Sequence, residues 1–410
     1  MANFKSILYH TVLFAAIVVA YRVTLAIHGR AEKQVHTDRK HGIEMVPGPL
    51  LQKDGKIKMS GYAKAPVREA DPELFRPGMF HYKPFLYMTY KRGMIHSVMS
   101  KDHIFVLEMT DRNYLAQFNA YYYDFETKKV LSHREIFFYG QYPKWGDEFS
   151  HFKGTWELKS SSGFSIKITD SESKNGGFNR HLETQIPAWD FKGDFVISKS
   201  KGQEGGFHTV PLYEDKRYWL KNFAQMNLAV DGQFSIGQEK VKVDSQTKRW
   251  NANFNDWSGI FAHKSYFRST WIQFDKMDKK DGTTPHEKMA FFGNMGLVQS
   301  TNARSEIDTI FMDNKTDQME PTLLWPNTDD YMDEWRIETH TEMRYSSHKI
   351  AGFFRPEAMY ERGWDIGVLR EEERIVFGTF DVQELRTTDT DQIFPNITGY
   401  GFSWDFYVHW

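Results

Sequence analysis

Residues 335–345 (WRIETHTEMRY) show the pattern that decides the fold class. Apolar and hydroxyl-bearing side chains, such as Trp335 and Ile337, occupy every second position. Charged and polar side chains, such as Glu338 and Arg344, occupy the positions between them. Successive side chains of a β-strand point to opposite faces, so this period of two predicts a strand with one buried face.

The same alternation recurs at short intervals from about residue 82 to the C-terminus. Between the alternating segments stand Gly-rich turns, and Asp231-Gly232 predicts a hairpin between residues 228–230 and 233–236. Residues 213–225 favour a helix, and the charged run 370–374 indicates a solvated turn before a strand. Further strands are predicted at residues 103–109, 115–125, 130–139, 155–158, 164–169, 181–186, 374–382 and 400–408.

Composition supports a mainly β fold. The chain has 410 residues, of which 16% are aromatic, and large rings pack well on a pleated surface. About 330 residues of alternating pattern exceed one eight-stranded barrel, so two antiparallel barrel-like halves are expected. The Gly- and Pro-containing segment 199–215 places their boundary between residues 205 and 206.

Charge and cysteine content exclude several classes of function. The 52 Lys and Arg residues balance 54 Asp and Glu residues, which argues against a nucleic-acid partner bound by charge. The absence of cysteine removes disulfides, thiolate nucleophiles and cysteine-bound metals. No metal-binding motif stands out, since His340 between Glu338 and Glu342 reads as a solvated strand face. We therefore expect neither a metal nor a cofactor.

The N-terminal segment differs from the rest. Residues 7–27 form the only long apolar run, long enough for one transmembrane helix within an anchor at residues 1–30. Residues 31–80 then read as a linker and loop-rich segment. Basic residues after the run place the C-terminal part on the matrix or cytosolic side, with the mitochondrial inner membrane favoured. The alternatives are a cleaved signal peptide, or the endoplasmic reticulum if the sequons at Asn314 and Asn396 are used.

The densest group of candidate functional residues lies in residues 253–274 (NFNDWSGIFAHKSYFRSTWIQF). Asp256 and His263 form a candidate catalytic proton donor and acceptor, because burial among rings raises the pKa of an acid. The alternative interpretation is a pair of core strands whose polar groups bond to backbone. Four further residues of this segment are candidates for ligand binding: Trp257, Tyr266, Arg268 and Trp271.

Several stretches together resemble the uncharacterised DUF2804 proteins, whose fold is similar to that of the lipocalin-like carotenoid hydratases and tocopherol cyclases. The resemblance implies two lipocalin-like β-barrel halves, at residues 81–205 and 206–410, with aromatic-lined interiors. The chain departs from the family pattern at Lys83-Pro84-Phe85, where a K-x-W strand is usual, and in NDWSGIF, which lacks an Arg. The stretches that carry the resemblance are residues 49–66, 103–129, 209–211, 256–271 and 401–404.

Two functions from different classes follow. The first is a non-catalytic accessory subunit of a membrane complex, held in the bilayer by residues 7–27. The alternative is a hydratase or cyclase that protonates a double bond of an isoprenoid or lipid, with Asp256 as the acid and His263 or Tyr266 as a relay. A carrier of an apolar ligand would need the cavity but not Asp256.

Overall fold

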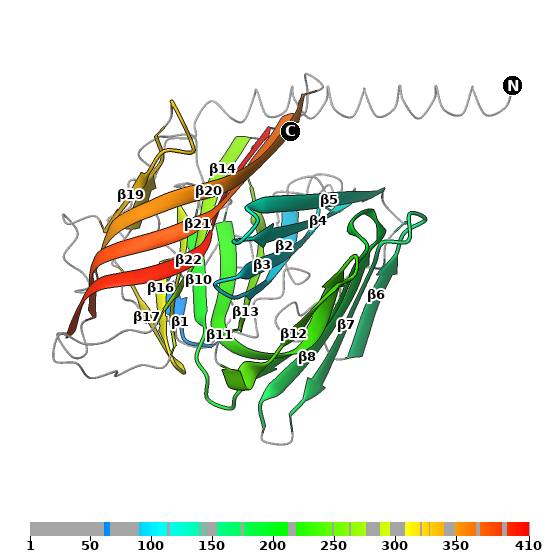
Figure 1. Ribbon diagram of the computed structural model, residues 1–410, viewed down its shortest axis with the longest axis horizontal. Coiled ribbons are helices and arrows are strands. Elements are labelled where there is room, and N and C mark those ends of the chain that lie inside the picture. The colour runs from blue at the N-terminus through cyan, green and yellow to red at the C-terminus, as the bar shows by residue number, and fades with distance from the viewer. Residues whose placement is uncertain are drawn as a thin grey trace, which may run out of the picture.

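The protein is mainly β in the computed structural model (Figure 1). Apart from strands, the described residues contain two 3-10 turns, and no helix among them is long and apolar enough to span a bilayer. The anchor expected at residues 7–27 lies outside the described residues. The structure describes residues 61–65, 90–112, 115–138, 141, 143, 154–173, 176–211, 219–247, 250–261, 264–275, 288–295, 308–319, 322–327, 329–339, 349–365, 370–387 and 392–409.

The first sheet has 13 strands, and they pair antiparallel throughout the described residues. Its main order is β5-β4-β3-β2-β13-β11-β9-β8-β7-β6; β10 and β12 also pair with β11, and β1 pairs with β10. The strands are β1 (Gly61–Ala63), β2 (Tyr90–Met99), β3 (His103–Asp111), β4 (Leu115–Asp124), β5 (Lys129–Phe138), β6 (Gly154–Lys159), β7 (Ser165–Glu172), β8 (Phe178–Ile186), β9 (Phe191–Lys199), β10 (Gly206–Pro211), β11 (Trp219–Ile236), β12 (Glu239–Val243) and β13 (Asn251–Ile260).

The second sheet has nine strands in the order β17-β16-β15-β14-β22-β21-β20-β19-β18. It begins with β14, the strand that follows β13 along the chain, and the domain boundary at 205/206 stays a prediction. Its strands are β14 (Lys264–Phe274), β15 (Met289–Met295), β16 (Thr309–Met312), β17 (Lys315–Gln318), β18 (Thr322–Trp325), β19 (Trp335–Thr339), β20 (Lys349–Asp365), β21 (Arg370–Thr387) and β22 (Gln392–His409).

Three apolar clusters stabilise the two sheets and the contact between them. One fills the concave side of the first sheet and includes Phe105, Phe118 and Phe254. Another, around Trp335, fills the second sheet. The third lies between the two sheets, where strands β2, β3, β4, β11 and β13 of the first face β14, β15, β20, β21 and β22 of the second (Figure 1). The central strands of the first sheet are therefore buried on both faces.

Two local expectations were wrong. Asp231-Gly232 makes no hairpin, because β11 runs through both residues and pairs with β9 and β12 on either side. A Cβ at Gly232 would lie 2.0 Å from the carbonyl oxygen of Asp194, so this glycine permits close backbone approach instead of a turn. The helix expected at residues 213–225 is likewise replaced by β11 from Trp219 onward.

Candidate functional site between the sheets

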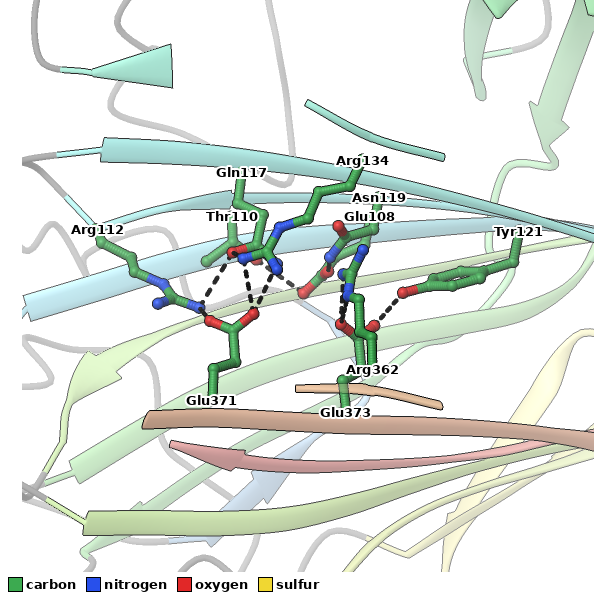
Figure 2. Close-up of polar contacts among 10 residues, drawn as sticks. All are labelled: Glu108, Thr110, Arg112, Gln117, Asn119, Tyr121, Arg134, Arg362, Glu371 and Glu373. Atoms are coloured by element: carbon green, nitrogen blue, oxygen red, sulfur yellow. Dashed lines mark hydrogen bonds and ion pairs between the residues drawn. The ribbon is translucent and has the colours of Figure 1, made fainter. Parts of the chain in front are cut away.

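A buried polar network lies where the two sheets face each other (Figure 2). Because side chains alternate along a strand, every second residue of β3, β4 and β21 points into this interface. The network joins residues from β3, β4, β5, β20 and β21, together with Arg112 just after β3. Its members are Glu108, Thr110, Arg112, Gln117, Asn119, Tyr121, Arg134, Arg362, Glu371 and Glu373.

Glu371, on the second sheet, binds three side chains of the first sheet. Its Oε2 accepts from Arg112 Nη2 at 2.8 Å, and its Oε1 accepts from Arg134 Nη2 at 2.7 Å. Gln117 Nε2 donates to the same Oε1 at 3.3 Å. Burial opposes ionisation of Glu371, but the two guanidinium groups outweigh it and hold its pKa below the usual range.

Glu373, two residues further along β21, forms a second link between the sheets. Arg362 Nε donates to its Oε2 at 2.8 Å, and the hydroxyl of Tyr121 donates to its Oε1. Burial raises the pKa of Glu373 despite the charge of Arg362. The two acids therefore differ: Glu371 has two strong cationic partners, whereas the ionised form of Glu373 is less well compensated.

Of the three acids in this network, Glu108 is the one that also lines a cavity. Thr110 Oγ1 donates to its Oε1 at 2.8 Å, and Asn119 Nδ2 donates to its Oε2. Burial raises the pKa of Glu108 to about 7, and the negative charge of Glu373 adds to that effect. A substantial fraction of Glu108 is thus protonated at neutral pH, as a general acid requires.

A cavity of about 40 Å³ adjoins Glu108 between the sheets. That volume is enough for a small number of water molecules, and a larger organic ligand would have to displace side chains of the cavity wall. The Trp257 and Phe261 rings meet edge to face with centroids 5.7 Å apart, and the Arg112 guanidinium lies 5.7 Å from the centre of the Phe406 ring. Aromatic walls with a few polar groups are typical of small-molecule sites. The lining includes Lys91, Glu108, Arg112, Trp257, Phe261 and Phe406.

Asp256 stands between two cavity-lining residues in the sequence, but its side chain lies on the opposite face of the sheet. Its neighbours Asn255 and Trp257 line the cavity, whereas Phe254, two residues before it, belongs to the core of the first sheet. Asp256 is fully buried, and neither carboxylate oxygen has a hydrogen-bond partner among the described residues. Burial raises its pKa to about 6, although Lys221 and other nearby cations oppose that shift.

The other predicted site residues are spread over three environments. Trp257 is the one that lines the cavity, and Trp271 is buried in the apolar cluster between the sheets. Tyr266 and Arg268 instead bind Asp405: the Tyr266 hydroxyl donates to Oδ2 at 3.2 Å, and Arg268 forms a buried ion pair. His263 lies outside the described residues, so its pairing with Asp256 stays a prediction.

Sequence reasoning missed the residues that form the network. The charged run 370–374 was expected to be a solvated turn, but it is the first part of β21, with Glu371 and Glu373 buried. All five residues of the run are charged, so its own sequence shows no alternation. The available signal was phase: if the strand predicted from residue 374 is extended backwards, Glu371 and Glu373 fall on the same face as Ile375 and Phe377. No group of three or more acidic or histidine side chains that could hold a metal ion occurs within the described ranges.

Comparison with known proteins identifies the family of the chain. No curated protein matches the sequence. Among solved structures, kievitone hydratase from Nectria haematococca is 11% identical with a TM-score of 0.42, over 78% of this chain and 89% of that one. CghA is 8% identical with a TM-score of 0.42, over 78% and 88%. The family described as "Domain of unknown function (DUF2804)" matches residues 40–401, so the chain belongs to the DUF2804 family.

Proposed function

We propose that the protein is an enzyme that protonates a carbon–carbon double bond of an isoprenoid or other apolar lipid, and then adds water or closes a ring. The observation that carries this proposal is the position of Glu108. It is a carboxyl group with a pKa of about 7 in the wall of an aromatic cavity. An acid in this state can deliver a proton near neutral pH without an outside cofactor.

The cavity walls suit the charge that such a step creates. Transfer of the Glu108 proton to one alkene carbon forms a C–H bond and leaves a cation on the other carbon. Trp257 and Phe406 line the cavity, and an aromatic ring there can stabilise that cation by cation–π contact. In hydration, water then attacks the cation and its proton returns to the Glu108 carboxylate, which restores the acid. In cyclisation, a second double bond attacks in place of water, and loss of a proton restores Glu108.

The remaining parts of the proposal concern fold and location. We infer that the two curled sheets are lipocalin-like barrel halves that have packed against each other. The anchor at residues 7–27 and the mitochondrial inner membrane remain proposals, and a tether of this kind would let the enzyme take its substrate from the bilayer. No contact among the described residues favours the accessory-subunit function.

Deuterium oxide provides a test that does not require the product to be known. Full-length protein in detergent would be incubated with farnesol, squalene and β-carotene, and the products examined by mass spectrometry for deuterium on carbon. We expect incorporation by the wild type and a fall of roughly 10²- to 10⁴-fold in Glu108→Gln. Glu372→Gln makes the same substitution at a partly exposed residue outside the cavity, and it serves as the control. No incorporation by the wild type, or equal incorporation by Glu108→Gln, would refute the proposal.

A further inference from the structure

The cavity between the sheets has the size of a water site. Its volume of about 40 Å³ accepts water without any movement of the wall, whereas a lipid enters only if side chains move aside. Some polar groups of the wall are already bound, since Thr110 donates to Glu108. Asn255 on β13 and Ser269 on β14 also line the cavity, and both keep hydrogen-bonding capacity that the protein does not use.

Asn255 provides an acceptor. Its side chain is buried, and its Oδ1 has no hydrogen-bond partner among the described residues. A buried carbonyl oxygen without a partner destabilises the fold, and a bound water molecule supplies the missing donor. An amide does not titrate near neutral pH, so Asn255 can hold water close to Glu108 without competing for its proton.

Ser269 provides a donor from the other sheet. It is buried, and its Oγ accepts a hydrogen bond from Trp271 Nε1 at 2.9 Å. A hydroxyl group that accepts one bond still carries a hydrogen that it can donate. An acceptor on the first sheet and a donor on the second give a water molecule the two polar partners that a buried site requires.

Strand register places this water site beside the acid. Ile95 on β2 is paired both with Glu108 on β3 and with Asn255 on β13. The three residues therefore form one row across the strands, and their side chains point to the same face. Neighbouring strands lie about 4.8 Å apart, so the Cα atoms of Glu108 and Asn255 are about 10 Å apart. Both side chains line the same cavity, so water fits between the carboxyl group and the amide.

We propose that Asn255 and Ser269 hold the water molecule that attacks the carbocation, so that the enzyme hydrates its substrate instead of cyclising it. This inference rests on the proposed function, in which Glu108 first transfers its proton to one alkene carbon. The water oxygen then forms a C–O bond with the cationic carbon, and its surplus proton passes to the Glu108 carboxylate. The sum is an alkene and water giving an alcohol, with no oxidant or reductant.

Double isotope labelling separates water attack from proton transfer. Full-length protein in detergent would be incubated with farnesol, squalene and β-carotene in deuterium oxide enriched in oxygen-18, and the products analysed by mass spectrometry. We expect the wild-type product to carry both labels. In Asn255→Leu, an apolar side chain of similar size, the ratio of oxygen-18 to deuterium should fall about 10- to 100-fold, because water is no longer positioned. The cation then loses a hydrogen from a neighbouring carbon and leaves a deuterated alkene.

Two further variants act as controls. Asn255→Asp keeps a side-chain oxygen as acceptor and should recover part of the ratio. Asn253→Leu makes the same change two residues away on the same face of β13, outside the cavity, and should keep the wild-type ratio. A ratio of two labels in one product does not depend on the fraction of protein that folds.

The outcomes separate this inference from the proposed function. Deuterium without oxygen-18 in the wild-type product, an unchanged ratio in Asn255→Leu, or no recovery in Asn255→Asp would overturn the inference and leave Glu108 as the acid. Absence of both labels from the wild type would refute the proposed function and this inference with it. A crystal structure without substrate tests the site independently of turnover. We expect a water molecule within hydrogen-bonding distance of Asn255 and Ser269, and a dry cavity would overturn the inference.

Discussion

Glu108 and Asp256 are both fully buried acids, and they illustrate how the same residue chemistry has different consequences on two faces of one sheet. Glu108 has a hydrogen-bond donor on each oxygen and faces the cavity. Asp256 faces the core of the first sheet, where neither oxygen has a hydrogen-bond partner among the described residues. An unsatisfied buried carboxyl group destabilises the fold once it ionises, whereas Glu108 is placed to exchange its proton with a ligand.

Asp256→Asn tests this difference through stability. The folded pKa of Asp256 is raised from 3.8 to about 6, so the folded state holds the proton more tightly than the unfolded state. The free energy of unfolding should therefore fall as the pH rises through this interval, and asparagine removes that fall. We expect the variant to be more stable than wild type by about 1–3 kcal/mol at pH 7, and equal to it below the unfolded pKa.

Urea unfolding at the two pH values measures this, and a variant less stable than wild type at neutral pH would contradict it. The same variant also separates the two candidate acids. Our proposal expects unchanged deuterium incorporation by Asp256→Asn, whereas loss of incorporation would support the sequence-based assignment of Asp256 as the catalytic acid. The sequence predicted that burial among rings raises the pKa here; it could not show which face Asp256 occupies relative to the cavity.

At the scale of elements, the pair formed by β2 and β13 shapes the cavity wall. Gly93 on β2 lies directly opposite Trp257 on β13. A Cβ built on Gly93 would come within 2.4 Å of Trp257 Cε2, so the indole covers the backbone of Gly93. A large ring over a strand glycine fills the surface that the missing side chain leaves. The absence of a side chain at position 93 thus fixes where the indole can lie.

Gly93→Ala should displace the indole towards the cavity and destabilise the fold by about 1–3 kcal/mol through overpacking. Trp257→Phe has a smaller ring, so it should recover part of that loss when combined with Gly93→Ala. Denaturant unfolding of the two single variants and the double variant gives the coupling energy. Strictly additive effects would show that the indole does not rest on Gly93.

Most strands were predictable, whereas several connections were not. The segments 103–109 and 115–125 correspond to β3 and β4, because regular alternation and aromatic residues are local signals. Asp231-Gly232 gave a false hairpin signal, since glycine serves both tight turns and close backbone approach. The charges of the run 370–374 suggested that it is exposed to solvent. Glu371 and Glu373 nevertheless occupy alternate positions of the same strand as Ile375 and therefore share its buried face.

At the scale of the whole molecule, contacts between residues far apart in the chain unite the two sheets. Arg112 and Glu371 are separated by 259 positions, and Tyr121 and Glu373 by 252. Side-chain alternation within one strand gives no information about which distant strand will face it. The sequence therefore predicted a two-part β architecture but missed the network between the parts. The cavity exists because these two surfaces meet, so the acid in its wall depends on the same contacts.

Glu371→Gln tests whether this network holds the sheets together. The variant leaves Arg112 and Arg134 without their shared carboxylate, and loss of one partner from a buried ion pair costs about 3–5 kcal/mol. Glu372→Gln is the matched control, because the adjacent Glu372 is partly exposed and pairs with partly exposed Arg370. Its cost should stay within about 0.5 kcal/mol. Both variants replace Glu by Gln, but urea unfolding should show a much larger loss of stability for Glu371→Gln than for Glu372→Gln. Equal losses would show that Glu371 does not hold the sheets together.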